Sequence, residues 1–371
     1  MRIGILTLPF NNNYGGYLQA YALMTVLKRM GHQPTLIMRR HNKARVSTRY
    51  KIKLFVAGLL KTIFTFKKHQ IIYDVEYSFN KKGRDMHKFV NEFMQPQTPY
   101  LYDTVSLKKY CEGKFDAYIV GSDQVWRAIY VPDIENFFLD FTKGWDVIRI
   151  AYAASFGTGH PEYTDKQVLQ CGKLLKYFDA VSIREKSGNK VFESFGWGNL
   201  NLKVVLDPTM LLNANDYSKV LPSVPSESLG KVFYYVLDFN STLKKLLEDT
   251  SSLLEKEVYG ISNIQQVGEV LPSIEKWLIN IRDSNFVVTD SFHGMVFSII
   301  FHKPFIVCVN FDRGVERFIS LLDELGLSNR IYNSNCNLQL LMANDINWVD
   351  VDKRIGLLRE KSIKFLKQQL Q

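Results

Sequence analysis

Short apolar runs alternate with longer amphipathic stretches along most of the chain. The runs at 2–6 and 34–38 are aliphatic and predict buried strands, whereas 16–31 has apolar residues at helical spacing and ends at Gly31. Strands that alternate with amphipathic helices are typical of parallel α/β units. The pattern therefore predicts an α/β protein built on parallel sheets.

The alternation forms two series, and 371 residues is long for a single hydrophobic core. We expect a Rossmann-like domain over 1–212 and a second Rossmann-like domain over 231–345. Residues 213–230, rich in serine and proline, predict a linker, and the helix within 346–371 is expected to pack back on the first domain. The predicted strands after the first two lie at 116–123, 148–155, 179–185, 202–211, 232–239, 258–261, 286–290 and 304–309.

Residues 41–95 interrupt the alternation and predict a mostly helical, basic insertion in the first domain. Between Lys43 and Lys68, lysines and arginines are interleaved with aromatic residues, as in many nucleic-acid-binding proteins, but no RNA or DNA module is recognisable. We therefore expect no nucleic-acid partner and favour peripheral contact with an anionic membrane surface. A solvated structural helix is the alternative.

Charge and cysteine usage narrow the function classes. The formal net charge of +10 favours an anionic ligand or surface. The four cysteines are widely spread and form no CxxC pair, which argues against a zinc site or a dense disulfide framework, so we expect no metal. The amino terminus fits a first strand and not a signal peptide, and no apolar run reaches the roughly 20 residues of a membrane span, which predicts a cytoplasmic protein, held at most at the inner membrane face.

Polar residues recur just past the predicted strand ends. Asp123, Ser155, Arg184 and Asp207 do so in the first series, and the group at 290–294 does so in the second. Ligands of open parallel sheets bind outside the carboxyl ends of the strands, where loops and helix amino termini converge. The positions therefore predict one cleft between the two domains.

The first loop, "NNNYGGYLQ", could present backbone N–H groups and a helix dipole to an anion, because Gly15 and Gly16 permit close approach. A tight turn capped by residues 11–13 is an equal alternative. At the third strand end, Asp123 either serves the site or caps the next helix.

Arg184 leaves a buried strand, where an unpaired guanidinium is costly, so it requires an anionic partner. That partner is either a ligand or a structural carboxylate such as Asp179. His293 lies where a strand passes into a helix, a position that suits a general base, although it could simply cap that helix. His160 follows another strand and is a second candidate, with a plain loop histidine as its alternative.

With these segments in hand, the chain resembles the polysaccharide pyruvyl transferase family. The resemblance rests on "NNNYGGYLQAYAL", "YIVGSDQVW", "YAASFG", "SIREKSG", "VVLDPTML" and "FVVTDSFHGMVFSIIFHKPFIV", in that order, over roughly residues 3 to 310. It implies a GT-B-like pair of Rossmann domains that uses phosphoenolpyruvate and no further cofactor. Such an enzyme installs a pyruvate ketal on a sugar, or on a lipid-linked oligosaccharide, of a bacterial cell-surface glycan or exopolysaccharide, and it releases phosphate.

In the family, an arginine of the "SxRE" segment and a histidine before the glycine of the last motif are functional, and they match Arg184 and His293. The chain departs from the family at Ser291, where many members carry arginine. Phosphoenolpyruvate requires fixed cations and N–H donors, and ketal formation requires a general acid and a general base. His293 is predicted to take one of these roles, and Asp123 or, less readily, Asp207 the other.

These arguments define the predicted site. We predict that His293, Arg184 and Asp123 are catalytic and that the substrates are bound by Asn13, Gly15, Gly16, Gln19, Ser122, Gln124, Ser155, His160, Asp207, Asp290, Ser291 and Gly294. The alternative function is that of a GT-B glycosyltransferase using a nucleotide sugar, for which Glu316 with Arg313 is the candidate binding pair.

Overall fold

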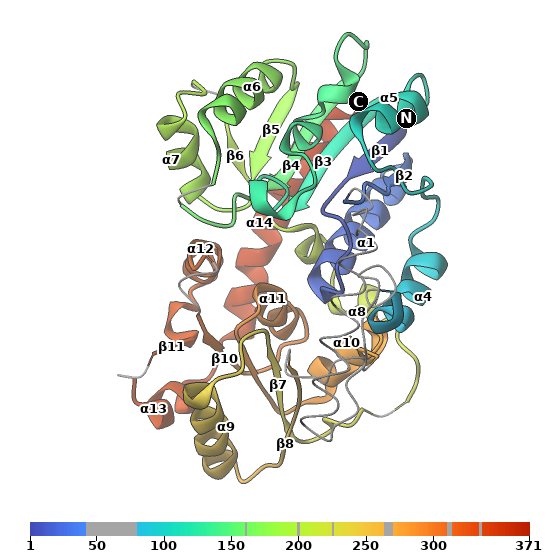
Figure 1. The fold of residues 1–371 in the computed structure, drawn as a ribbon. Helices are drawn as coiled ribbons and strands as arrows, with labels where there is room; N and C mark the ends of the chain where they lie inside the picture. Colours follow the sequence, from blue (N-terminus) through green and yellow to red (C-terminus); the bar gives the residue numbers. More distant parts are fainter. Residues whose placement is uncertain are drawn as a thin grey trace, which may run out of the picture.

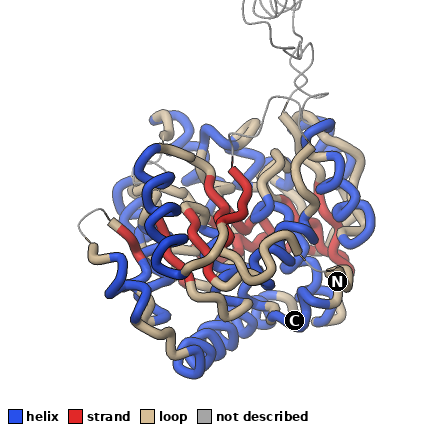
Figure 2. Tube along the Cα trace, turned by 90° about the horizontal axis from the view of Figure 1, so that it is seen from below, coloured by secondary structure: helices blue, strands red, loops and turns tan. Residues whose placement is uncertain are grey.

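The computed structural model contains two parallel β-sheets with helices around them (Figure 1). Seen from below, the strands lie in the interior and the helices mostly outside (Figure 2). The predicted α/β class is therefore confirmed. The described residues are 1–41, 80–159, 162–198, 201–224, 226–262, 270–309, 314–333 and 336–371.

The first sheet is six-stranded, in the order β2-β1-β3-β4-β5-β6, and every pair is parallel. Most of its strand residues are buried, as the aliphatic runs predict. Its strands are β1 (Arg2–Leu6), β2 (Gln33–Ile37), β3 (Ala117–Asp123), β4 (Ile148–Ala154), β5 (Ala180–Ile183) and β6 (Lys203–Val204). Its helices are α1 (Tyr14–Arg29), α4 (Arg84–Phe93), α5 (Thr104–Cys111), α6 (Asp165–Leu175) and α7 (Ser187–Ser194), with 3₁₀ turns η1 (Ala128–Tyr130), η2 (Ile134–Phe138), η3 (Asp140–Thr142) and η4 (Pro208–Leu211).

The second sheet is five-stranded, in the order β11-β10-β9-β7-β8, and is also parallel. Its strands are β7 (Val232–Val236), β8 (Val258–Ser262), β9 (Phe286–Thr289), β10 (Phe305–Cys308) and β11 (Ile331–Tyr332). Its helices are α9 (Ser241–Leu254), α10 (Ile274–Asp283), α11 (Phe292–Ile300), α12 (Glu316–Leu325) and α13 (Leu338–Ala343), with η6 (Ser328–Arg330).

Both sheets reverse their winding direction once. In the first sheet, β1 lies between β2 and β3, and in the second, β7 lies between β8 and β9. A crevice forms where two neighbouring strands send their following helices to opposite faces, and open α/β sheets bind ligands there. The carboxyl ends of β1, β3, β7 and β9 are therefore the positions where function is expected.

Part of the predicted linker is ordered helix. Helix α8 (Ala214–Ser218) begins at a capping box in which the Asn213 side chain accepts from the Asp216 N–H. Asp216 also pairs with Arg29 of α1 at 2.7 Å. Tyr217 is fully buried and donates its hydroxyl to the Thr209 carbonyl. One buried tyrosine therefore anchors the start of the segment predicted as a linker.

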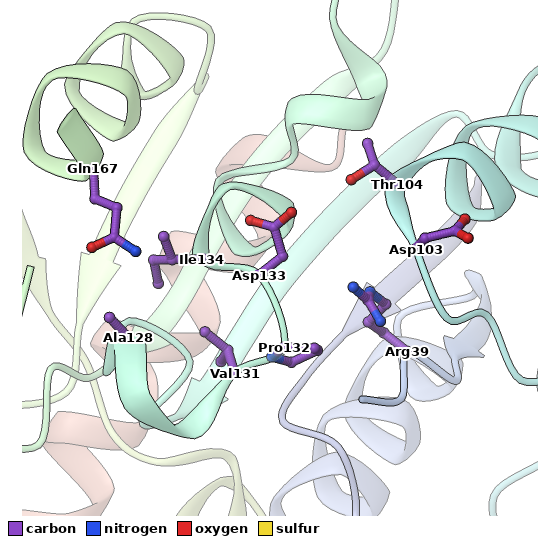
Figure 3. A pocket seen from close by; sticks show the side chains of 9 residues that line it. All are labelled: Arg39, Asp103, Thr104, Ala128, Val131, Pro132, Asp133, Ile134 and Gln167. Carbon is purple, nitrogen blue, oxygen red and sulfur yellow. The ribbon is translucent and has the colours of Figure 1, made fainter. Parts of the chain in front are cut away.

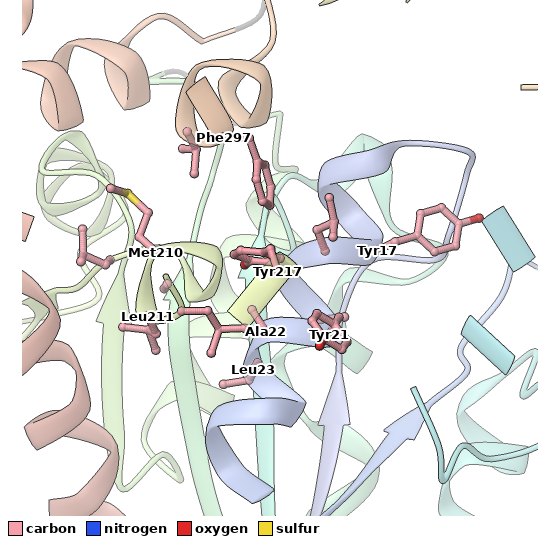
Figure 4. Packing of buried hydrophobic residues seen from close by; sticks show 14 of the residues in the cluster. Tyr17, Tyr21, Ala22, Leu23, Met210, Leu211, Tyr217 and Phe297 are labelled. Carbon is pink, nitrogen blue, oxygen red and sulfur yellow. The ribbon is translucent and has the colours of Figure 1, made fainter. Parts of the chain in front are cut away.

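One apolar cluster contains residues of both domains (Figure 4). Tyr217 meets Phe297 of α11 edge to face, with ring centroids 4.8 Å apart, and Tyr14 of α1 stacks on Trp277 of α10 at 5.1 Å. Burying an aromatic side chain of this size stabilises a fold by about 1.5–3 kcal/mol. These contacts hold the amino terminus of α1 against α10, and α8 against α11, the helix that carries His293.

The last helix, α14 (Trp348–Gln369), runs from the C-terminal domain towards the first sheet (Figure 1). Ser362 accepts a hydrogen bond from the Leu206 N–H at 3.0 Å, and Arg359 donates to the carbonyls of Met210 and Leu212. These contacts bracket Asp207 on both sides. The helix therefore helps to position a residue of the predicted site.

Most of the predicted basic insertion lies outside the described residues. Helix α4 lies in the described part of the predicted insertion, and it packs Met86, Phe89 and Val90 into the core. Among the described helices, none is both long and apolar enough to cross a bilayer.

Candidate functional site

An ion-paired cluster lies at the carboxyl edge of the first sheet. Arg184 follows β5, and its Nη1 lies 2.9 Å from Asp207 Oδ2 and 3.3 Å from Asp123 Oδ1. Its Nε lies 3.7 Å from Glu185 Oε2. All four side chains are buried. Three strand ends thus deliver one guanidinium and three carboxylates to a single point.

The charges in this cluster stabilise one another against the cost of burial. Burial lowers the pKa of Arg184, but Asp123, Asp207 and Glu185 outweigh it and raise that pKa above its ordinary value. Burial likewise raises the pKa of Asp207, but His293, Arg184 and a hydrogen bond from Thr209 dominate and hold it well below its usual range. Asp207 is therefore ionised at neutral pH.

His293 enters the cluster from the C-terminal domain. It is the second residue of α11, which begins where the Ser291 side chain accepts a hydrogen bond from the Gly294 N–H at 3.3 Å. The imidazole Nε2 lies 3.6 Å from Asp207 Oδ2, an ion-pair separation that is longer than a hydrogen bond. Asp207 thus stands between Arg184 of the first domain and His293 of the second.

The other edge of the His293 ring lies against the glycine loop. A Cβ built on Gly15 would stand 2.6 Å from His293 Cε1 and closer still to Nδ1 and Cγ, whereas ordinary contacts begin near 3.4 Å. Asn13 caps α1 by accepting from the Gly15 N–H at 3.2 Å. Gly15 is therefore required for the close approach of the imidazole, and the capping alternative for Asn13 is also present.

Several buried polar atoms of the site make no hydrogen bond to the described part of the chain. They are Arg184 Nε and Nη2, Glu185 Oε2, Gln124 Oε1 and His293 Nε2. Buried polar groups in folded proteins nearly always have partners, because an unmade hydrogen bond costs free energy. A cluster of such atoms is the arrangement expected of a site that receives a polar ligand.

Gln19 and Ser122 support the cluster from the switch point of the first sheet. Ser122 Oγ donates to Asp207 Oδ2 at 3.2 Å, and the Ser122 N–H donates to Gln19 Oε1 at 3.0 Å. Gln19 Nε2 donates in turn to Thr7 Oγ1 at 2.7 Å. The chain of hydrogen bonds links the ends of β1 and β3 to the central carboxylate.

The remaining predicted residues of the first domain are placed as follows. Ser155 Oγ donates to Glu185 Oε1 at 2.7 Å, so it orients the carboxylate beside Arg184. Gln124 lies against Gly157, where a Cβ would overlap its side chain, and Gly16 faces open space. His160 lies outside the described residues. Asp179 accepts from the Arg149 N–H, so the suggested structural pair with Arg184 is replaced by pairs with Asp123 and Asp207.

Asp290 and Gly294 shape the second domain's edge. The Asp290 carboxylate accepts from the N–H groups of Leu237 and Asp238 at 2.7 and 2.8 Å, which ties the end of β7 to that of β9. Gly294 packs directly on Thr289, because a Cβ there would overlap the hydroxyl. Through these contacts, Asp290 and Gly294 help to hold the strand end and the helix start that position His293.

The sequence does not predict three residues that lie at the site, Glu185, Phe292 and Arg317. Glu185 directly follows Arg184, and Phe292 directly precedes His293, so proximity in sequence was the available signal. Arg317 lies in the segment that suggested Glu316, but its position beside Phe292 follows from the fold alone. Arg313, the other residue of that suggestion, lies outside the described residues.

A separate polar pocket of about 300 Å³ opens at the same sheet edge (Figure 3). Arg39 follows β2, Val131 and Asp133 follow β3, and Thr104 begins α5. The Arg39 guanidinium is held by Asn136 and by backbone carbonyls, so part of this polar lining is structural. Over the described ranges, no three His, Cys, Asp or Glu side chains group as metal ligands.

The cluster can bind an anion and move a proton. Arg184 Nε and Nη2, which make no hydrogen bond to the described residues, can donate to a carboxylate or a phosphate. A histidine beside an ionised aspartate is the arrangement that orients an imidazole for proton transfer. Two parallel-sheet domains that bring such groups together across their carboxyl edges define a GT-B-like architecture.

The chain belongs to the polysaccharide pyruvyl transferase family, and it is therefore a transferase. The model of that family matches residues 13–313, which span most of the chain and include Arg184, Asp207 and His293. No curated protein matches the chain.

Solved structures of similar fold are GT-B glycosyltransferases and epimerases. Arabidopsis thaliana UGT89C1 in complex with UDP-L-rhamnose has a TM-score of 0.50 at 11% identity, covering 98% of each chain. A Listeria monocytogenes protein assigned as a UDP-N-acetylglucosamine 2-epimerase has a TM-score of 0.50 at 8% identity, covering 97% of this chain and 91% of its own. At these identities, the likeness confirms the GT-B-like fold alone.

Proposed function

We propose that the protein transfers a pyruvate ketal from phosphoenolpyruvate to two hydroxyl groups of one sugar in a bacterial cell-surface glycan or exopolysaccharide. In this reaction the enol carbon gains two C–O bonds to the acceptor and loses its bond to phosphate. One hydroxyl proton ends on the methylene carbon, which becomes methyl, and the other leaves with phosphate. No oxidant or reductant is consumed.

The observation that supports this function best is the carboxylate shared between domains. Asp207 lies 2.9 Å from Arg184 Nη1 and 3.6 Å from His293 Nε2. Arg184 would hold the donor's anionic groups, and His293 would move a proton between the acceptor and the donor. Because Asp207 is ionised, it suits the orientation of His293 rather than proton donation. Asp123 is the remaining carboxylate for a second proton transfer.

Phosphate release from phosphoenolpyruvate tests the function, with lipid-linked or model galactosides, mannosides and glucosides as acceptors. We expect release that depends on one acceptor class and is reduced to a residual rate by His293→Ala and by Arg184→Ala, with melting curves to verify folding. Near-normal release by either folded variant would remove that residue from the mechanism. Absence of release with every acceptor would count against the donor assignment.

A nucleotide-sugar glycosyltransferase is the second candidate, and the fold shared with UGT89C1 favours it. A ligand that binds only the folded state raises the melting temperature. Stabilisation by a nucleotide sugar and not by phosphoenolpyruvate would favour this alternative, whereas the opposite result supports pyruvyl transfer.

Membrane association is a proposal that rests on sequence, because residues 42–79 are outside the described ranges. The basic and aromatic segment would hold the protein at the anionic inner leaflet, where each basic residue contributes roughly 1 kcal/mol. Cosedimentation with anionic liposomes at low salt is the expected result. If the protein stays in the supernatant under these conditions, the idea is discarded.

A further inference from the structure

A second guanidinium reaches the cluster from the C-terminal domain. Arg317 is the second residue of α12, and its Cζ lies 5.6 Å from the centroid of the Phe292 ring. Arg184 Cζ lies 4.6 Å from the centroid of the same ring. Both guanidinium groups, one from each domain, therefore lie near the same aromatic side chain.

Charged groups of the cluster act on Arg317. Burial, followed by the positive charge of Arg184, lowers the pKa of Arg317 to about 10, while Asp123 and Glu185 act in the opposite direction. Arg317 is therefore protonated at neutral pH. Arg317 thus brings a second positive charge to a cluster in which the carboxylates outnumber Arg184, and a protonated guanidinium there can form charge-assisted hydrogen bonds with an anion.

The position of Arg317 is fixed by a close contact between the domains. Gly314 has φ +81°, and a Cβ on it would lie 2.7 Å from the carbonyl carbon of Gly157, closer still to its oxygen. At the far end of α12, Glu324 pairs with Lys186 at 2.5 Å. Helix α12 thus faces the α7 side of the first domain (Figure 1). Its first turn is held where the cluster lies.

We propose that Arg317 binds the phosphate group of the donor and that, with Arg184, it makes the site selective for small anions carrying at least two negative charges. This inference rests on the proposed function, because phosphoenolpyruvate carries both a phosphate and a carboxylate. Guanidinium groups form charge-assisted, paired hydrogen bonds with either group. One arginine from each domain would then couple donor binding to the alignment of His293.

Steady-state kinetics with varied phosphoenolpyruvate test the role. Arg317→Ala is expected to raise KM by about tenfold or more, the typical effect of losing a charged hydrogen bond, while kcat changes much less, because the contact persists through the reaction. Arg317→Lys should recover part of the affinity. Lys186→Ala is the control, since it removes an exposed positive charge and an exposed interdomain ion pair. A KM for Arg317→Ala within twofold of that of the wild type overturns the proposal.

Calorimetric titration with inorganic phosphate separates this inference from the proposed function. The wild type and Lys186→Ala are expected to bind phosphate equally, and Arg317→Ala at least about tenfold more weakly. That result supports the anion site even if the wild type releases no phosphate from phosphoenolpyruvate. Equal phosphate binding by Arg317→Ala and the wild type contradicts the inference, whatever the donor proves to be.

Discussion

The contact between Gly15 and His293 gives the sharpest single-residue prediction. A Cβ at residue 15 would lie 2.6 Å from His293 Cε1, and ordinary contacts begin near 3.4 Å. The imidazole or α1 must therefore move by about 1 Å, and a displacement of this size can lower a catalysed rate about 100-fold. Gly15→Ala should thus lower kcat by about two orders of magnitude.

The assay is phosphate release from phosphoenolpyruvate, followed together with the melting temperature. Overpacking at a buried contact costs typically about 1–3 kcal/mol, so the variant is expected to remain folded. Gly356→Ala in α14 is the matched control, because nothing lies within 4 Å of its added Cβ. It should be fully active and, if anything, slightly more stable.

A near-normal kcat of Gly15→Ala would refute this prediction, because catalysis could not then depend on the present position of the His293 imidazole. Equal losses in Gly15→Ala and Gly356→Ala would refute it as well, since the second substitution displaces no group of the site.

The remaining predictions concern the central carboxylate, the α12 contact and pH. Asp207→Asn keeps the shape of the side chain but removes the negative charge shared by Arg184 and His293, so kcat should fall by about 10³–10⁴. A loss in kcat below tenfold would exclude the role of Asp207 in orienting His293. Gly314→Ala should lower the melting temperature and the affinity for phosphate more than Gly230→Ala does, because Gly230 has a similar positive φ but open space around it. Equal effects of the two substitutions would mean that backbone strain alone matters. Burial raises the pKa of Asp140 to about 6, so the folded state favours its protonated form and the free energy of unfolding falls as pH rises from about 4 to 6. Asp140→Asn should therefore raise the free energy of unfolding by about 2 kcal/mol at pH 7 and leave it unchanged at pH 4. Denaturant unfolding at both pH values measures this difference, and an equal effect at the two pH values would contradict it.

The fold class could be predicted because the signals are local. Aliphatic runs such as 116–123 and amphipathic stretches such as 16–31 repeat in the order that parallel α/β units require, and the structure places β3 and α1 there. The rule that ligands bind at carboxyl strand ends also brought Arg184, Asp207 and His293 into one hypothesis, and the structure brings these three side chains together.

What the sequence left open depends on distances between domains. The sequence ranked Asp207 after Asp123 for proton transfer. Asp207 does cap η4 with one oxygen, yet its second oxygen faces Arg184 and His293. Arg317 has no motif, because only the packing of α12 against the first domain brings it to Phe292. The short helix α8 was hidden by serine and proline, although Asn213 and Asp216 form a recognisable capping box.

If Arg184 and His293, supplied by different domains, act as one reacting centre, a double-variant cycle on kcat/KM for phosphate release will show it. Residues that act as a unit show strongly non-additive losses. We expect Arg184→Ala/His293→Ala to be no slower than the slower single variant, within about threefold. Losses that multiply in the double variant would mean that the two residues contribute independently and do not form one reacting centre.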